Sequence, residues 1–151
     1  MTIRCEIVSQ DRLVWEGDAD LVIVPGVSGE MGILPNHAPL LSTLQFGILK
    51  VRYEDQEEIF SVAGGVVEIQ PDVITVLADS AENVEEIDIA RAEEARKRAE
   101  KILEEGPPPD SDAYMKMEAA LRRSNLRLDA ARRYRRGQRS RPAGMGKGES
   151  D

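Results

Sequence analysis

Residues 47–77 read GILKVRYEDQEEIFSVAGGVVEIQPDVITVL, a string of short apolar runs separated by turn residues. The runs are rich in β-branched residues and lie at 47–53, 58–63, 66–70 and 73–77. The polar stretch 54–57 and the pair Pro71-Asp72 stand between runs, where turns are expected. Short β-branched runs at this spacing are typical of antiparallel sandwiches and barrels, so the stretch predicts a sheet built from hairpins.

Similar runs precede this stretch, at 3–8, 13–15 and 21–25, and the last of them ends at Pro25 and Gly26. Helical periodicity is absent from 3–77. The lone cysteine, Cys5, lies in the first run and reads as a plain strand residue. We therefore predict that residues 1–82 form an antiparallel β-sandwich.

The character of the sequence changes after Ala78, where Ala, Glu, Arg and Lys dominate as far as residue 105. These residues favour helix. Asn83 followed by Glu86 resembles a capping box, and Asp88 can cap the same helix one turn later. Gly106 and the three prolines that follow it must end this helix, because proline lacks the amide donor.

A second amphipathic pattern begins after the prolines, and Asp110, Ser111 or Asp112 can cap it. Apolar and small residues recur there at steps of three or four, at Tyr114, Met117, Leu121, Ser124, Leu128 and Ala131. Two amphipathic helices with a short connection form an antiparallel hairpin. The predicted fold class is α+β: an antiparallel β-sandwich (1–82), an antiparallel two-helix hairpin (83–136), and a glycine- and charge-rich tail (137–151) expected to be disordered.

The hairpin is predicted to be only marginally stable when detached from other surfaces. Its seam is rich in alanine, and each alanine buries little apolar area. Because buried apolar surface stabilises by about 25 cal/mol per Å², the seam contributes little free energy. Marginal stability is what a conformational switch requires.

Composition excludes several classes of protein. No apolar run approaches the roughly 18 residues that span a bilayer, and the first residues lack the pattern of a signal peptide, so we expect a cytoplasmic protein without membrane insertion. One cysteine and one histidine cannot make an internal disulfide or a zinc site. No metal site, nucleophile-base pair or phosphate-binding loop is visible, so we expect no catalytic residues.

Charge is divided unevenly along the chain. The total is -8, but residues 1–80 carry -9, residues 81–110 carry -5, and residues 111–151 carry +6. A basic terminal segment on an acidic body can fold back on that body or bind an acidic partner.

The segment 29–40 reads GEMGILPNHAPL. Its glycines and prolines predict a stiff loop, which can be purely structural. His37 has no evident nucleophile or metal companion. A rigid exposed loop that carries Glu30 and His37 also suits an interface, and both readings stay open.

This segment closely resembles the G-E-x-G-I-L-P-x-H-x-P-L signature of ATP synthase epsilon subunits. Two further stretches are similar to landmarks of that family: 61–69, SVAGGVVEI, and 87–92, IDIARA. The three occur in the family's order and spacing, and the resemblance covers residues 1 to about 136.

The resemblance implies a non-catalytic rotor subunit of a proton-transporting F-type ATP synthase, at the cytoplasmic face of the bacterial plasma membrane. It implies contacts of Glu30 and His37 with the membrane rotor ring of c subunits and the gamma subunit. It further implies that the hairpin meets an acidic loop of a catalytic beta subunit and opposes ATP hydrolysis. Arg122, Arg123 and Arg127 are the residues carried over to that contact.

No cofactor is implied, but some members of the family bind ATP as a regulatory ligand in the folded hairpin. The positions that match that site are Glu82, Ile87, Asp88, Arg91, Ala92, Arg123 and Arg127. Two arginines one turn apart can face a triphosphate, and Asp88 can accept from adenine or ribose. Alternatively, Asp88 only caps its helix and Arg91 pairs with a neighbouring acid.

The arginines of the second helix allow a second interpretation of the protein's function. They lie at 122, 123, 127, 132, 133, 135 and 136 and can be a solvated face or a nucleic-acid surface. The acidic body and the scarcity of aromatic residues disfavour nucleic acid. The alternative function is a free-standing nucleotide-sensing or nucleic-acid-binding adaptor.

Overall fold

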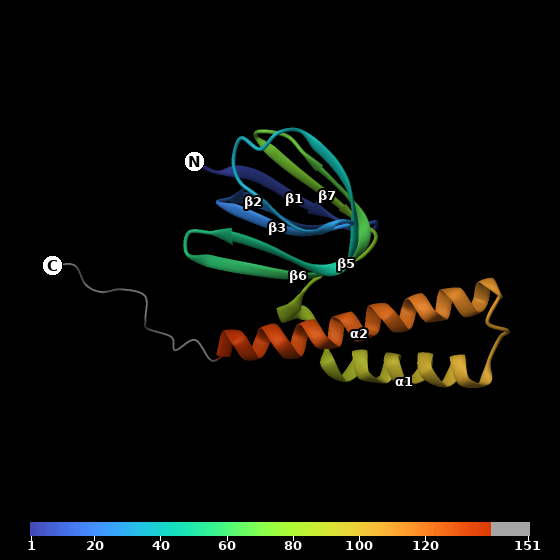
Figure 1. Ribbon diagram of the computed structural model, residues 1–151. Helices are drawn as coiled ribbons and strands as arrows, with labels where there is room; N and C mark the ends of the chain where they lie inside the picture. Colours follow the sequence, from blue (N-terminus) through green and yellow to red (C-terminus); the bar gives the residue numbers. More distant parts are fainter. Residues whose placement is uncertain (140–151) are drawn as a thin grey trace.

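The computed structural model describes residues 1–139, with side chains through Tyr134. Eight strands are followed by a short 3₁₀ turn and two helices (Figure 1). The strands are β1 (Ile3–Val8), β2 (Leu13–Ala19), β3 (Leu21–Gly26), β4 (Gly29–Ile33), β5 (Leu40–Tyr53), β6 (Gln56–Ile69), β7 (Val73–Ala78) and β8 (Ala81–Asn83). The 3₁₀ turn η1 (Val84–Glu86) leads into α1 (Ile89–Glu105) and α2 (Asp112–Arg139). This arrangement confirms the predicted sandwich followed by two helices.

The strands are ordered β2-β1-β7-β6-β5-β3-β4, and β8 pairs with β6. Every pairing is antiparallel except that of β1 with β7, which is parallel. The predicted antiparallel sandwich thus contains one parallel pair, which the sequence did not indicate. β1 and β7 are far apart in the chain, so no hairpin turn dictates their relative direction.

The long strands β5 and β6 join the two layers of the sandwich. One part of β6 pairs with β8 through residues 60–62, and a later part pairs with β7 through residues 65–69. Gly64 and Gly65 lie between these parts and have φ of +83° and +122°. Because glycine adopts positive φ readily, the strand can change partners at this point.

The β5–β6 hairpin turns more tightly than expected. Tyr53 pairs with Gln56, which leaves only Glu54 and Asp55 in the turn, with φ of 46° and 63°. Two consecutive positive φ values belong to the two-residue hairpin turns that match the twist of the strands. The predicted four-residue turn at 54–57 is therefore two residues long.

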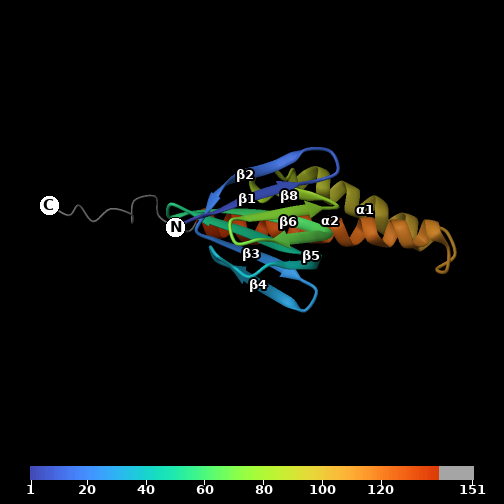
Figure 2. The ribbon, with the colours of Figure 1, turned by 90° about the horizontal axis from the view of Figure 1, so that it is seen from above.

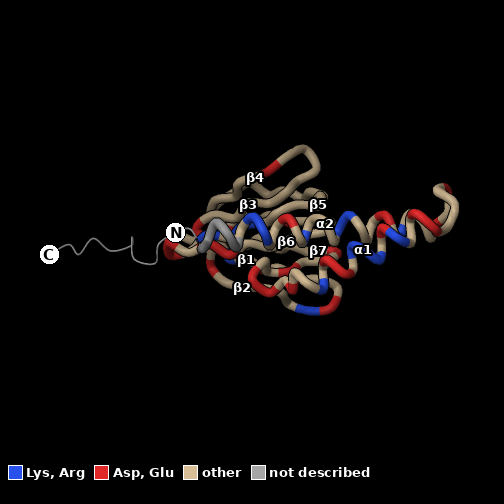
Figure 3. The backbone as a smooth tube through the Cα atoms, turned by 90° about the horizontal axis from the view of Figure 1, so that it is seen from below, with Lys and Arg blue, Asp and Glu red and all other residues tan. Residues whose placement is uncertain are grey.

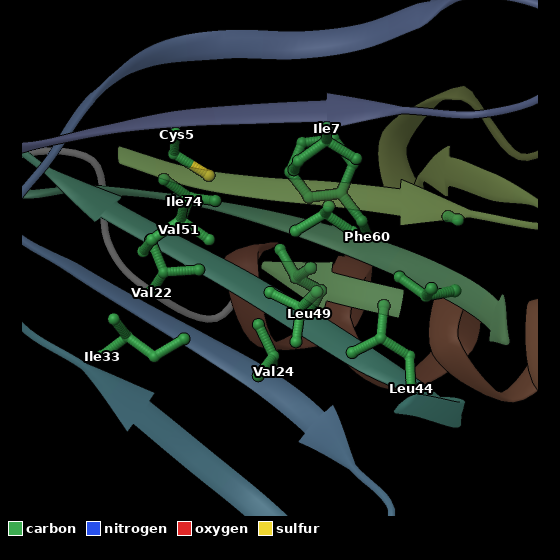
Figure 4. Close-up of a cluster of buried hydrophobic side chains, with 14 of the residues drawn as sticks. Cys5, Ile7, Val22, Val24, Ile33, Leu44, Leu49, Val51, Phe60 and Ile74 are labelled. Carbon is green, nitrogen blue, oxygen red and sulfur yellow. The ribbon is translucent and has the colours of Figure 1, made fainter. Parts of the chain in front are cut away.

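Alternate residues of the strands point into one apolar core (Figure 4). It contains the side chains of Ile3, Cys5, Ile7, Ala19, Val22, Val24, Ile33, Leu44, Leu49, Val51, Phe60, Val62, Val67, Ile69, Ile74, Val76, Ala78 and Ala81. Cys5 is buried among them, as expected for a strand residue.

The first helix begins later than expected. Asn83 accepts from the amide of Glu85 and caps η1, whereas Asp88 accepts from the amide of Arg91 and caps α1. Between the two turns Ile87 is extended and buried, so the capping box at Asn83 does not start a continuous helix.

The second helix begins after Ser111, whose Oγ accepts from the amide of Tyr114 at 3.2 Å. Of the three predicted caps, Ser111 is the one that makes this bond. The helix continues to Arg139, three residues beyond the expected limit. The sequence predicts disorder for 137–151; residues 137–139 are instead helical, and 140–151 lie outside the described residues.

The two helices lie side by side beneath the sandwich, and α2 lies nearer to the strands (Figure 1). The end that carries their connection projects beyond the strands (Figure 2). Among the described helices, neither is long and apolar enough to cross a membrane.

Candidate functional site

Helix α2 docks on the sandwich through a small apolar cluster that is separate from the main core. The buried members are Ile59, Val84, Ile87, Ala130 and Ala131, with Ile48, Ile89 and Tyr134 packed against them. Two of these are alanines, so the cluster buries limited apolar area. Polar contacts, described below, add to the contact between α2 and the sandwich.

A cavity of about 350 Å³ lies beside this cluster, between the sandwich and α2. It is lined by Arg12 of the β1–β2 turn, by Ser80, Ala81 and Glu82 at the start of β8, and by Ala120, Arg123, Ser124 and Arg127 of α2. Its volume falls in the range of about 300 to 1,000 Å³ that is usual for small-molecule sites. The cavity is thus a candidate ligand site at the contact between the two domains.

Glu82 and Arg127 form a two-point ion pair inside this cavity. Arg127 Nε donates to Glu82 Oε2 at 2.7 Å, and a terminal guanidinium nitrogen donates to Oε1 at 3.2 Å. The two side chains are 25% and 33% exposed. This geometry matches the planar fork of arginine to the carboxylate and holds α2 against β8.

Arg123 lies one turn before Arg127 and lines the same cavity. Within the described part of the chain its guanidinium makes no hydrogen bond or ion pair. It is exposed, so an anion can reach it from solvent.

The structure therefore brings together three of the residues expected at an ATP site: Glu82, Arg123 and Arg127. The other four, Ile87, Asp88, Arg91 and Ala92, do not line the cavity.

Ile87 and Ala92 are buried. Asp88 Oδ1 accepts from the amide of Arg91 at 3.1 Å and caps α1, which is the structural role considered above. Arg91 is exposed in the first turn of α1.

Arg122 stacks on the sandwich in this conformation. Its guanidinium carbon lies 4.4 Å from the centre of the Phe46 ring. Farther along α2, Lys50 Nζ lies 5.1 Å from the centre of the Tyr134 ring. Figure 3 shows basic residues at intervals along α2, beside a sandwich that carries many acidic residues. Of the three arginines expected to meet a beta subunit, Arg122 and Arg127 are thus engaged with the chain itself.

The expected rotor-facing residues lie on another part of the sandwich. Glu30 is exposed in β4, next to Pro25 of β3. His37 is half-buried in the loop between β4 and β5, with Nδ1 2.7 Å from the carbonyl oxygen of Ala38. The amide of Asn36 donates to the carbonyl of Pro71 at 2.9 Å, so the loop is tied to the β6–β7 turn.

Apolar side chains are exposed on this loop and at the start of β5. Leu34 is 59% exposed, and Leu41 is 70% exposed. Together with a cavity of about 450 Å³ lined partly by Pro39 and Leu40, they give this edge an apolar surface.

Sequence reasoning missed Arg12, Phe46 and the two cavity serines, Ser80 and Ser124. Arg12 lies 70 positions before Glu82 in the chain, and only the folded sheet brings its turn to β8. The helical pattern places Ser124 on the inward face of the second helix, but no local pattern marks any of the four as part of a site.

The described residues hold no group of three or more His, Cys, Asp or Glu side chains that is arranged to bind a metal ion. Burial raises the pKa of the Cys5 thiol to about 12, so this thiol stays protonated at neutral pH.

Comparison with known proteins agrees with these features. Residues 2–84 match the β-sandwich domain of the ATP synthase delta/epsilon chain family, and residues 85–132 match its long α-helix domain. The ATP synthase epsilon chain of Dehalococcoides mccartyi is 46% identical over 134 residues, which cover 89% of this chain and 95% of the relative. That of Moorella thermoacetica is 45% identical over 131 residues, which cover 86% and 96% of the two chains.

Solved structures show the same fold. A chain of the mitochondrial ATP synthase of Euglena gracilis, solved as an OSCP/F1/c-ring assembly, matches with a TM-score of 0.70 and 26% identity, over 86% of this chain and 81% of that one. A chain from the central stalk and c-ring of the Tetrahymena thermophila enzyme has a TM-score of 0.56 over 85% and 93% of the chains. At 15% identity the second match shows the fold alone. These matches show that the chain belongs to the epsilon-chain family of the F-type ATP synthases and is a non-catalytic subunit of that complex.

Proposed function

We propose that the chain is a rotor subunit in the central stalk, at the cytoplasmic face of a bacterial plasma membrane. There it contacts the gamma subunit and the membrane ring of c subunits, and it couples the proton-driven rotation of the ring to the catalytic head. The assemblies in which the similar chains were solved contain a c-ring, which supports this placement.

The edge that carries Glu30 and His37 is the proposed contact with the ring and gamma. Glu30 is exposed, and Leu34 and Leu41 add apolar area that a partner can cover. The test is co-purification of gamma and ring subunits with the wild-type chain and with Glu30→Ala and His37→Ala variants. If neither subunit co-purifies with the wild type, the rotor placement fails.

We further propose that the hairpin restrains ATP hydrolysis by leaving the sandwich and meeting a catalytic beta subunit. The observation that carries this proposal is the nature of the contact between α2 and the sandwich. A small apolar cluster with two alanines among its five buried members and a few arginine contacts hold the helix, so we expect undocking to cost little. Undocking frees Arg122 and Arg127, beside Arg123, for carboxylates of a partner.

The experiment is ATP hydrolysis by an F1 assembly that lacks epsilon, with either the full chain or residues 1–84 added. The full chain should lower the rate, and the sandwich alone should bind without lowering it. An Arg122→Ala, Arg123→Ala, Arg127→Ala variant should inhibit less than the wild type. Equal inhibition by the full chain and by residues 1–84 would place the inhibitory contact in the sandwich instead.

ATP is the proposed regulatory ligand of the docked hairpin, and we propose no other cofactor. The cavity between β8 and α2 supports this, because it holds Glu82, Arg123 and Arg127 together and its arginines suit phosphate. Asp88 and Arg91, at the start of α1, do not line the cavity in the conformation described, and we propose that they turn towards the ligand when it binds. Bound ATP would stabilise the docked form by RT ln(1 + [L]/Kd), where [L] is the ATP concentration. Plentiful ATP would therefore relieve the inhibition of ATP hydrolysis.

Titration of the isolated chain with ATP, followed by calorimetry and amide NMR shifts, tests this proposal. Binding should shift amides near Asp88 and Arg91 and should weaken in an Arg123→Ala, Arg127→Ala variant. No binding at several millimolar would remove ATP as a regulator and leave the arginines to protein carboxylates alone.

The free-standing adaptor is not retained as a second function. The family matches span residues 2–132, including most of the arginine-bearing helix, and two of its arginines, Arg122 and Arg127, contact the sandwich.

A further inference from the structure

Arg12 reaches the cavity from the sandwich rather than from the hairpin. It ends the short turn between β1 and β2, and its carbonyl accepts from both the amide and the hydroxyl of Ser9, at 2.9 and 3.3 Å. These two bonds hold the turn in place, so the position of Arg12 is set by the sheet. Its side chain lines the cavity together with Arg123 and Arg127 of α2.

The charges around the cavity favour an anion with several negative groups. Among the lining residues three are arginines and one, Glu82, is acidic, and Glu82 is already paired with Arg127. The second nearby carboxylate belongs to Glu86, which lies 3.5 Å from a guanidinium nitrogen of Arg12. Both of these side chains are more than half exposed, at 53% for Arg12 and 61% for Glu86, so the pair exchanges partners readily.

The cavity also offers neutral donors suited to phosphate oxygens. Ser80 and Ser124 line it on opposite sides of the contact, one on the segment before β8 and the other on α2. Hydroxyl groups donate to phosphate oxygens, and arginines bind them with paired N–H groups.

We infer that Arg12 is a third phosphate-binding arginine of this cavity, one that takes the outer phosphates of a polyphosphate chain when it releases Glu86. This inference rests on the nucleotide binding proposed above and deepens it. A ligand held by Arg12 on one side and by Arg123 and Arg127 on the other is bonded to both domains at once. Its phosphates would therefore fasten α2 to the β1–β2 turn directly, beyond the contacts that α2 makes without ligand.

Calorimetric titration of the full chain with ATP, AMP and inorganic tripolyphosphate tests the inference in three variants. Arg12→Ala should weaken the binding of ATP and tripolyphosphate by about tenfold, because a charge-assisted contact is lost, and should change AMP binding little. Glu86→Gln should tighten ATP binding by a few-fold, since it removes the competing carboxylate. Arg12→Lys should recover part of the affinity, because it keeps the charge but not the paired donors.

Matched controls separate this contact from a general effect of charge. Arg4 and Glu16 form an exposed ion pair at 3.0 Å on β1 and β2, and neither lines the cavity. Arg4→Ala and Glu16→Gln change the net charge by the same amounts and should leave ATP binding near the wild-type value.

The outcomes distinguish this inference from the proposal beneath it. If Arg12→Ala binds ATP as the wild type does while Arg123→Ala binds it weakly, the nucleotide site stands and the role of Arg12 is refuted. An equal loss for ATP and AMP would likewise refute contact with the outer phosphates, as would an equal loss in Arg4→Ala. If the wild type binds neither ATP nor tripolyphosphate, the nucleotide site and the inference fail together.

Discussion

Gly65 is a position where one added methyl group meets the backbone of the next strand. Its φ is +122°, and an added Cβ would lie 2.2 Å from the carbonyl oxygen of Leu77. We expect Gly65→Ala to lower the free energy of unfolding by at least about 2 kcal/mol, from backbone strain together with the clash. Urea denaturation measures this change.

Gly32→Ala is the matched control for that substitution. Gly32 lies in the same sheet, its nearest contact for an added Cβ is a flexible Leu21 methyl at 3.7 Å, and its φ is not positive. It should change stability by less than about 1 kcal/mol. Similar losses in both variants would show that the cost is general to glycines of the sheet rather than specific to the change of strand partners.

Cys5 gives the stability of the sandwich a dependence on alkaline pH. Its pKa is raised by burial from the ordinary 9.0 to about 12, so the folded state holds the thiol proton more tightly than the unfolded state does. The resulting stability is fully present below pH 9 and is lost as pH rises from 9 towards 12. Urea denaturation at pH 8 and pH 10.5 should therefore show a larger loss of stability in the wild type than in Cys5→Ala. An identical pH dependence in the two proteins would contradict this.

At the scale of elements, Asp88 is the cap that starts α1. Its carboxylate accepts from the amide of Arg91, so Asp88→Ala should cost about 1 kcal/mol of stability, and Asp88→Asn, an equally good cap, should cost little. Thermal unfolding and hydrogen exchange in the first turn of α1 measure the difference. An Asp88→Asn variant that keeps its stability but loses ATP affinity would show that the carboxylate also serves the ligand.

The contact of Arg122 with Phe46 joins α2 to β5. A cation over an aromatic ring at an exposed site contributes about 0.5 to 1 kcal/mol, so Phe46→Leu should raise the rate of hydrogen exchange in α2 by a few-fold. A double-mutant cycle of Phe46→Leu with Arg122→Ala isolates the pair. A coupling energy near zero would mean that the ring and the guanidinium are neighbours without a stabilising interaction.

At the scale of the whole molecule, the main core of the sandwich is complete without the helices. It uses only residues between Ile3 and Ala81, and the separate docking cluster joins Ile59 of the sandwich to Val84, Ile87 and two alanines of α2. We therefore expect residues 1–84 to fold without the helices. Their NMR spectrum should keep dispersed resonances that overlay those of the full chain away from Ile48 and Ile59. Loss of dispersion would show that the hairpin is part of one cooperative unit.

Much of the architecture follows from neighbours in the chain. Alternation in 47–77 predicted the strands, the three prolines after Gly106 predicted the end of the first helix, and the candidate caps included Asp88 and Ser111. These features depend on backbone propensity and on side chains only a few residues apart. Both can be read directly from the sequence. The motif at 29–40 likewise indicates the family from the sequence alone.

The sequence by itself thus determined the two domains, their order and the family to which the chain belongs. Only the tertiary structure decided the parallel pairing of β1 with β7, the pairing of Glu82 with Arg127, and the meeting of Arg12 with the arginines of α2. These contacts join residues tens of positions apart. The β1–β7 pair forms because its inward side chains share the core of the sandwich. The two contacts with α2 form because the helix buries Ala130 and Ala131 against the sandwich, and the spacing of residues within one helix does not reveal which surface will receive it.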